Sequence, residues 1–204
     1  MLWGDIISTS KKMDTSAEHV FREYMQKTVL TVLSRNGYFN KLVFQGGTAL
    51  RLFYGNPRFS EDIDLVVKQS EKKIDDTALS SKIETFAKDW FPFLNQVSVT
   101  QQKNTSEMQR FIVKTKGEQK SQITRIHIEI AYVPSYINQP KILDFPPLNP
   151  AVRVEELVEI LADKLTAVGC RSYVKGRDLW DIYFLTEEKN VDTSTDLISK
   201  KIAD

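Results

Sequence analysis

Residues 42–54 read LVFQGGTALRLFY, and residues 60–67 read SEDIDLVV. The first stretch predicts a short apolar strand over Leu42–Phe44, a break at Gly46-Gly47 and a helix over Thr48–Tyr54. That helix should stop at Gly55-Asn56-Pro57, because proline disfavours helical geometry in the residue before it. The second stretch predicts a strand over Asp62–Val67. The expected order is therefore strand, glycine turn, short helix, strand.

The second strand carries two carboxylates on one face. Its two-residue period puts Asp62 and Asp64 on one side and Ile63 and Leu65 on the other. Carboxylates roughly 7 Å apart by backbone spacing can converge on one or two hard cations such as Mg²⁺ or Mn²⁺. Without a cation, each would raise the pKa of the other. Asp-x-Asp alone also fits a solvated edge strand, so the preceding turn has to support the metal interpretation.

Gly46 and Gly47 stand at a strand end just before a helix. There the backbone can approach a phosphate closely, with unpaired N–H groups and the positive end of the helix dipole aimed at it. Thr48 can cap the helix or donate its hydroxyl to the same phosphate, and Arg51, one turn further on, can supply charge. A nucleoside triphosphate would then lie between this turn and metals held in the Ser60-x-Asp62-x-Asp64 stretch. The glycines alone equally fit a simple tight turn.

Glu129 offers a third carboxylate. In Arg125–Ala131, isoleucines alternate with polar residues, so Glu129 faces away from the aliphatic side. In two-metal phosphoryl transfer, with the metals about 3.5 to 4 Å apart, a third acid usually helps to hold the metal that activates the attacking hydroxyl. Alternatively, Glu129 pairs with Arg125 or with a neighbouring strand. His127 is expected to be a polar face residue and not a ligand, because hard cations prefer oxygen.

The C-terminal part contains one anomaly. A helical wheel at 100° per residue places Lys164 within the apolar sector of a helix expected over Val152–Cys170. A lysine there must either extend outward to solvent or meet an anion at the edge of a cleft, and that anion would be the triphosphate.

Two further acids begin the next expected helix, Arg177–Leu185. The helix dipole alone accounts for Asp178 in the first turn. Asp181 shares a partly apolar face, so it needs a partner such as Arg171, Lys164 or Arg177.

Composition narrows the class of protein. The chain has 204 residues, 41% of them hydrophobic and 27% charged, and its net charge of +1 gives no global basic field. Cys170 is the only cysteine, so neither a disulfide framework nor a Cys-based zinc site can form, and a reducing compartment such as the cytoplasm is expected. No apolar run or signal-like N-terminus indicates a membrane role.

The remaining pattern predicts an α+β fold. Helices are expected over Ser16–Ser34 and Asp75–Asp89. Strands are expected at Val97–Thr100, Arg110–Lys116 and Ile123–Tyr132, and the hairpin spacing predicts that they are antiparallel neighbours. Pro134–Pro150 is proline-rich without periodicity, and a last helix is expected over Ser194–Ile202. The expected division is a core over 1–133 with the Gly-Gly and Asp-x-Asp motifs, a connector over 134–150 and a helical part over 151–204.

Two blocks of the chain resemble a known family. Residues 44–51 (FQGGTALR) through 58–65 (RFSEDIDL), and residues 155–165 (EELVEILADKL) with 177–181 (RDLWD), are similar to the AbiEii/AbiGii-type nucleotidyltransferase toxins of the DNA polymerase beta-like superfamily. Together the blocks span about Leu42 to Leu185, which is most of the chain. Many relatives are longer, so a helical segment that shapes acceptor choice is expected to be missing or reduced after Leu185.

The resemblance implies a nucleotidyltransferase core with a small mixed sheet flanked by helices, and a helical C-terminal part. It also implies that Asp62, Asp64 and Glu129 hold the metal. Lys164 and Asp178 join these three acids as catalytic residues. The implied nucleotide-binding residues are Gly46, Gly47, Thr48, Arg51, Ser60 and Lys164. Lys164 would contact the triphosphate. Relatives are toxins of abortive-infection or toxin–antitoxin pairs, which implies a cognate antitoxin.

The favoured hypothesis is a magnesium-dependent transfer of a nucleoside monophosphate from an NTP to an RNA, tRNA included, or to a protein hydroxyl. One alternative is a catalytically inactive nucleotide-binding interaction protein of the same fold. The intact acids argue against that alternative, because a pure binder needs no full acidic set. Metal-dependent phosphoester hydrolysis ranks last, because it would need more His and Asp ligands than the chain supplies.

Overall fold

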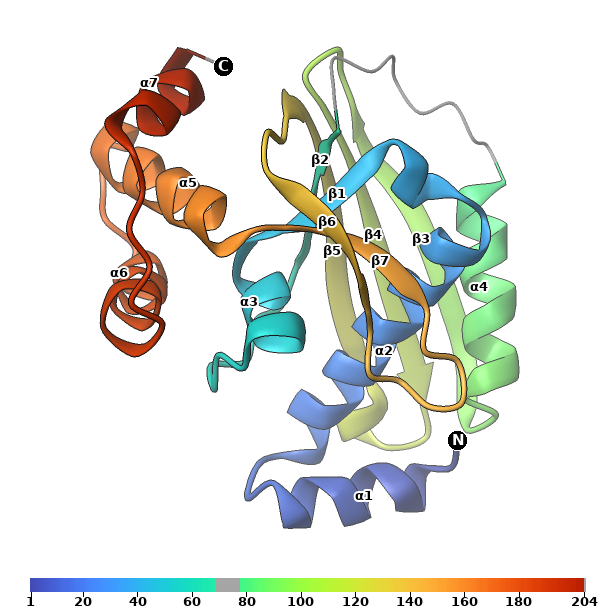
Figure 1. Cartoon of the computed structure of the whole chain (residues 1–204). Helices are drawn as coiled ribbons and strands as arrows, with labels where there is room; N and C mark the ends of the chain where they lie inside the picture. Colours follow the sequence, from blue (N-terminus) through green and yellow to red (C-terminus); the bar gives the residue numbers. More distant parts are fainter. Residues whose placement is uncertain (69–77, 204) are drawn as a thin grey trace.

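A mixed β-sheet forms the centre of the protein in a computed structural model that describes residues 1–68 and 78–203 (Figure 1). Within those ranges the sheet has seven strands in the order β3-β4-β5-β2-β1-β7-β6. The strands are β1 (Leu42–Gln45), β2 (Ile63–Val67), β3 (Leu94–Asn104), β4 (Met108–Gly117), β5 (Thr124–Pro134), β6 (Asn138–Ile142) and β7 (Ala151–Glu155).

The helices lie in two groups. Helices α1 (Trp3–Lys12), α2 (Ala17–Arg35) and α4 (Leu79–Trp90) cover one face of β3–β5 (Figure 1). Helix α3 (Gly46–Tyr54) follows β1 directly, and α5 (Leu157–Cys170), α6 (Gly176–Tyr183) and α7 (Thr195–Ala203) stand beside the sheet. A five-residue π-helical turn, Phe184–Glu188, follows α6. Short 3₁₀ turns occupy Tyr38–Asn40 and Lys120–Gln122.

The main core lies between the sheet and α1, α2 and α4. Alternate residues of β4 and β5, among them Val113, Ile126 and Ile128, point into it and are fully buried. Phe21 of α2 packs edge-on against Phe91 within the same core. Removing this apolar surface from water is the principal stabilisation of the layer. The opposite face of β3–β5 therefore carries the polar residues of the alternation.

A smaller core attaches the C-terminal helices. Leu50 of α3 packs with Ile160 and Leu161 of α5 and with Phe184 and Leu185 after α6. Helix α3 thus contacts the C-terminal helices through Leu50 and the sheet core through Ala49. This arrangement sets α5 and α6 beside the strand that carries Asp64.

Many expected elements are confirmed. Strand β1, the glycine break, helix α3 and strand β2 follow in the predicted order, and α2 covers the helix expected from Ser16. Strands β3, β4 and β5 are antiparallel neighbours. Helix α4 begins at Leu79, and positions 75–77 of the helix expected there lie outside the described residues. Every helix in the described part of the chain is too short or too polar to cross a lipid bilayer.

Two expectations around residue 150 are wrong. The helix expected from Val152 begins at Leu157, because residues 151–155 form β7, which pairs in parallel with β1 at Phe44. The alternation of buried Val152 and Val154 fits this half-buried strand better than a helix. The stretch Pro134–Pro150, which was expected to be irregular, contributes strand β6. This is an edge strand of the described sheet, and it tolerates Pro140 because one side of its backbone pairs with no described strand.

Helix α1 was not expected from the sequence.

Candidate active site

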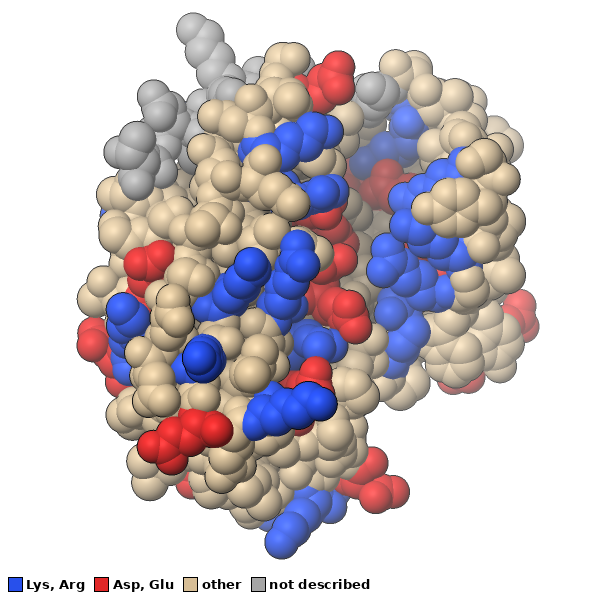
Figure 2. Space-filling view, turned by 180° about the vertical axis from the view of Figure 1, so that it is seen from behind, with Lys and Arg blue, Asp and Glu red and all other residues tan. Residues whose placement is uncertain are grey.

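A cleft lies between the sheet and helices α5 and α6. In Figure 2, which shows the molecule from behind, acidic side chains gather inside this hollow and Lys and Arg side chains stand along both walls. The cleft is lined, on the sheet side, by Gln45, Gly46, Gly47, Arg58, Ser60, Asp62, Asp64, Leu65, Met108, Arg110, Glu129 and Ala131. On the helical side it is lined by Asp163, Lys164, Ala167, Arg171, Lys175, Arg177 and Asp178.

Strand register puts the acids in one row. Asp64 of β2 pairs with Gln45 of β1 on one side and with Glu129 of β5 on the other. Side chains directly opposite on neighbouring strands lie close enough to interact. Asp62 immediately precedes β2 and lies on the same side as Asp64, because strand residues two apart share a face. The three acids therefore come from two parallel strands and meet inside the cleft.

Asp64 is the most electrostatically strained of the three acids. Burial, and after it the nearby carboxylates of Asp62 and Glu129, raise its pKa to about 6 against the opposing effect of Lys164 and Arg177. The carboxylates of Asp62 and Glu129 are thus close enough to disfavour the ionised form of Asp64. Such a site favours a cation or a proton.

The glycine turn closes against Asp64. Gly46 adopts a left-handed φ of 80°, and a Cβ there would lie 2.6 Å from Oδ2 of Asp64. A Cβ on Gly47 would lie 2.5 Å from Nη2 of Arg58 and 3.0 Å from Oγ of Ser60. Only glycine gives both the backbone conformation and the room for these approaches. The turn and the acids, about eighteen positions apart in sequence, are thus in direct contact.

Two of the acids are held by side chains of β4 and β5. Asp62 Oδ1 lies 3.1 Å from Nδ1 of His127, and Glu129 Oε1 lies 2.9 Å from Nε of Arg110. About a quarter of each of these two carboxylate side chains is exposed. His127 was expected to be an ordinary polar residue of the strand face, and the structure places it against an acid of the site.

The chemistry of these three acids fits a hard divalent cation, although their present positions do not form a finished metal site. No three His, Cys, Asp or Glu side chains within 1–68 and 78–203 converge in metal-binding geometry. The acids supply the oxygen ligands that Mg²⁺ prefers, and the carboxylates of Asp62 and Glu129 act with burial to raise the pKa of Asp64. Binding a cation would require Asp62 and Glu129 to turn from His127 and Arg110.

Lys164 meets anions of its own chain. Its Nζ lies 3.1 Å from Oδ1 of Asp178 and 2.9 Å from Oδ2 of Asp181, and Asp178 also accepts a hydrogen bond from Arg171. Burial alone would raise the pKa of Asp178, yet Lys164, Arg171 and Arg177 lower it below its ordinary value. The anions that Lys164 contacts in the structure are thus two carboxylates of α6, where the sequence had suggested a triphosphate.

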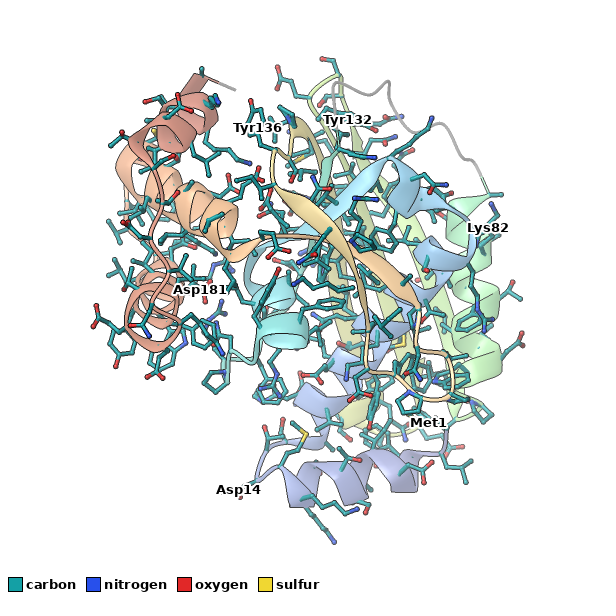
Figure 3. The ribbon with its side chains drawn as sticks, in the orientation of Figure 1. Met1, Asp14, Lys82, Tyr132, Tyr136 and Asp181 are labelled. Atoms are coloured by element: carbon teal, nitrogen blue, oxygen red, sulfur yellow. The ribbon has the colours of Figure 1, made fainter. Side chains whose placement is uncertain are left out.

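Asp181 is the fully buried centre of this network. Its carboxylate accepts two hydrogen bonds of 2.8 Å from Nη2 of Arg58 and another from Asn56. It also forms the ion pair with Lys164. Figure 3 shows Asp181 on the side of α6 that faces α3. The partner expected for Asp181 was Lys164, Arg171 or Arg177, and the structure confirms Lys164 and adds Arg58.

The structure does not bring two of the expected nucleotide-binding side chains to the cleft. The Arg51 guanidinium turns to Glu23 at 2.9 Å and lies over the ring of Phe59, 4.0 Å from its centroid. The Thr48 hydroxyl is buried and donates to the backbone carbonyl of Asp62, so it fastens α3 to the acidic strand. Gly46, Gly47, Ser60, Lys164 and Asp178 all line the cleft.

Several cations of the cleft were not predicted, notably Arg58, Arg110 and Lys175. Arg110 could have been found only from the β4–β5 register, which places it opposite Glu129. Arg58 precedes the acidic strand by a few residues, but only the folded loop shows that it turns toward α6.

Comparison with known proteins agrees with this geometry. A family model for the nucleotidyl transferase AbiEii toxin of type IV toxin–antitoxin systems matches residues 28–204. The chain belongs to the AbiEii toxin family. It is accordingly a nucleotidyltransferase, and its α+β fold agrees with that assignment.

Two solved structures resemble this AbiEii protein along most of its length. One, a Helicobacter pylori protein described as a nucleotidyltransferase, is 25% identical with a TM-score of 0.64 and covers 91% of this chain and 75% of its own. The other, JHP933 from Helicobacter pylori, is 25% identical with a TM-score of 0.63, covering 91% and 73% respectively. A search of curated proteins gives no match.

Proposed function

We propose that this AbiEii protein transfers a nucleoside monophosphate from an NTP to a hydroxyl group of an RNA, with tRNA as the leading candidate. The observation that carries the proposal is the contact between the glycine turn and the acid row: Gly46 closes against Asp64, which stands beside Glu129. A polyphosphate at the turn would therefore have its reacting phosphorus next to the carboxylates. Family membership supports a nucleotide substrate and a cognate antitoxin as partner.

The reaction forms a bond between the acceptor oxygen and the α-phosphorus. The bond from that phosphorus to the bridging oxygen breaks, pyrophosphate leaves, and the hydroxyl proton passes to solvent. The protein's contribution is to position the groups and to neutralise charge, as phosphoryl transfer generally demands. Positioning falls to the turn and to the acid row.

Each wall of the cleft has its own part. Backbone N–H groups at Gly46 and Gly47, at the N-terminus of α3, face the phosphates, and Ser60 adds a hydroxyl beside Gly47. Arg58 adds positive charge beside Gly47, and Lys164 and Arg177 supply it from the helical side of the cleft. Asp178 and Asp181 hold Lys164 in place until a triphosphate competes for it.

Asp62, Asp64 and Glu129 would hold Mg²⁺, or Mn²⁺, which when bound stabilises charge on the phosphate oxygens and lowers the pKa of the attacking hydroxyl. Ligation requires these carboxylates to be ionised. The raised pKa of Asp64 therefore makes metal affinity fall as the pH is lowered through about 6.

The direct test is to incubate the protein with each α-³²P-labelled NTP, Mg²⁺ and total RNA, and to follow label in RNA and in protein separately. Asp62→Ala and Asp64→Ala should each abolish labelling, whereas Asp144→Ala, which removes an exposed carboxylate outside the cleft, should leave it unchanged. Labelling by the two cleft variants at the wild-type level would refute the metal assignment. Label in protein alone would refute the RNA acceptor.

A thermal-shift scan separates turnover from mere binding. A catalytic metal site predicts that NTP raises the melting temperature more in the presence of Mg²⁺ than without it. Stabilisation by NTP that is independent of Mg²⁺, together with no labelling, would instead indicate a nucleotide-binding protein that does not turn over.

A further inference from the structure

The outer face of β3–β5 is bare of helices and rich in positive charge. The strand alternation that buries Val113 and Ile126 turns the intervening residues outward. This basic sheet face is defined by Lys103 of β3, Arg110, Lys114 and Lys116 of β4, and Arg125 of β5. Figure 2 shows Lys and Arg side chains gathered on the surface beside the cleft.

Within residues 1–68 and 78–203, most of the charges of this face have no acidic partner. Lys103, Lys114, Lys116 and Arg125 are exposed, and none of them makes an ion pair with the described residues. The β4–β5 register sets Lys114 directly opposite Arg125, and like charges directly opposite each other destabilise a sheet. Glu129, the one acid on the outward face of these strands, is already paired with Arg110.

Protection of a sheet edge does not explain the arrangement. Lysines on an edge strand prevent unwanted pairing with other chains, and Lys103 on β3 fits that role. Strands β4 and β5 are internal, because β3 flanks β4 and β2 flanks β5. Their unpaired cations therefore need another reason.

Surface hollows connect this face to the acids. One hollow, over β3–β5, is lined by Gln96, Ser98, Lys114, Thr115, Lys116, Ile123, Thr124 and Arg125. A second hollow shares Ile123, Thr124 and Arg125 with the first and reaches His127 and Asp62. Its two other acids, Glu18 and Glu61, are both paired with Arg22. Asp62 also lines the cleft, so the two hollows and the cleft form one path.

We propose that the basic sheet face binds the phosphate backbone of the RNA acceptor and leads its reacting end past His127 to Asp62. The inference rests on the proposed function, because it assumes that the acceptor is RNA. An in-line displacement requires the acceptor hydroxyl to approach from the side opposite the leaving pyrophosphate. In the proposed function the triphosphate binds at the glycine turn, whereas the second hollow reaches Asp62 beside His127 and is not lined by Gly46 or Gly47.

The test is RNA binding measured without turnover. Anisotropy of a 5′-fluorescein-labelled single-stranded RNA is titrated with protein in the absence of NTP, at several salt concentrations. The variant Lys114→Gln/Arg125→Gln should raise the Kd about tenfold and reduce the slope of log Kd against log salt by about 1.4, at about 0.7 per lost phosphate contact.

A matched control carries the same loss of net charge. Lys11→Gln/Lys88→Gln neutralises exposed lysines of α1 and α4, on the helical face, and should leave both the Kd and the salt slope at the wild-type values. Equal effects of the two double variants would overturn the inference, since they would show a response to net charge alone.

The outcomes also separate this inference from the proposed function. Wild-type RNA binding by Lys114→Gln/Arg125→Gln, with RNA still labelled, overturns the docking face and leaves the enzyme assignment intact. Conversely, RNA binding that depends on Lys114 and Arg125, in a protein that labels no RNA with any NTP, overturns the assignment and supports the docking face. In the labelling assay, the double variant should raise the KM for RNA without raising the KM for NTP.

Discussion

Asp64 holds its proton more tightly than an ordinary aspartate does. Burial and the carboxylates of Asp62 and Glu129 raise its pKa from 3.8 to about 6. A raised carboxyl pKa means that the folded protein binds this proton more tightly than the unfolded chain does. The stability contributed by protonated Asp64 is therefore fully present below about pH 4 and is lost as the pH rises through about 6.

Asp64→Asn should consequently raise the stability of the protein at neutral pH and abolish its activity. In metal-free buffer at pH 7.5 the variant should melt at a higher temperature than the wild type, because it removes a buried like-charge contact, and the difference should shrink below pH 4. Transfer activity should be lost. Differential scanning fluorimetry across this pH range checks the prediction, and added Mg²⁺ should stabilise the wild type but not the variant. A pH-independent difference would contradict the assignment of the strain to Asp64.

Gly46 and Gly47 should differ in their tolerance of a methyl group. Gly46→Ala combines a positive φ, worth about 1 to 2 kcal/mol of strain, with a contact against the enclosed Asp64 carboxylate. Gly47→Ala carries no positive-φ strain, and its cost is the displacement of side-chain ends, Nη2 of Arg58 and Oγ of Ser60.

Urea unfolding should therefore show a larger loss of stability for Gly46→Ala than for Gly47→Ala. Gly169→Ala is the control, since a Cβ there meets nothing within 4 Å and alanine favours the helix by up to about 1 kcal/mol. The reverse order of the two turn variants would show that the contact with Asp64 is not the limiting one.

At the scale of elements, Asp181 joins the loop after α3 to α6. Its fully buried carboxylate binds Arg58 and Asn56 from that loop and Lys164 from α5. These contacts fix the distance between the two walls of the cleft. Asp181 therefore positions two cations of the site, Arg58 and Lys164, without itself lining the cleft.

Asp181→Asn should destabilise the protein by about 3 kcal/mol, because removing one partner of a buried ion pair leaves the other charges uncompensated. It should also raise the KM for NTP, as Arg58 and Lys164 lose their common anchor. The matched control is Asp196→Asn, which breaks a solvent-exposed ion pair with Lys200 and should leave stability nearly unchanged. Equal unfolding midpoints for the two variants would contradict the role given to Asp181.

The elements that sequence reasoning found are those that local chemistry determines. Residues 42–67 carry their own start and stop signals, so the order β1, glycine turn, α3, β2 could be read directly. Strand β7 could not, because residues 151–155 fit a helix and a strand almost equally well, and the parallel pairing with Phe44, over one hundred residues away, decides between them. Arg58 and Arg110 were missed for the same reason: loop path and strand register bring them to the site.

At the scale of the whole molecule, Lys201 near the C-terminus holds several segments together. Its Nζ contacts the carboxylates of Glu155 at 3.5 Å, Glu159 at 2.6 Å and Asp163 at 3.0 Å, and only 4% of its side chain is exposed. Burial lowers the lysine pKa, but the surrounding carboxylates raise it above its ordinary value. Glu155 of β7 and Glu159 of α5 are both fully buried around this cation.

Lys201→Met should destabilise the protein by about 3 to 5 kcal/mol, because it leaves buried carboxylates without their cation. Lys200→Met, at the neighbouring and exposed position, should leave stability nearly unchanged. Chemical denaturation of both variants, with Lys201→Arg as the conservative substitution, checks the prediction. Similar losses for positions 200 and 201 would mean that the helix, and not the buried cation, supplies the stability.

The order in which the site residues occur along the chain affects when the toxin can act. The acids at 62, 64 and 129 leave the ribosome well before Lys164 and Asp178, and β1 lacks its β7 neighbour until residue 155 has been made. Since chains generally fold from the N-terminal end as they are synthesised, a nascent polypeptide presents an incomplete catalytic centre for most of its translation. A growing chain that has not yet produced α5 and α6 therefore lacks the helical wall of the cleft, including Lys164 and Asp178.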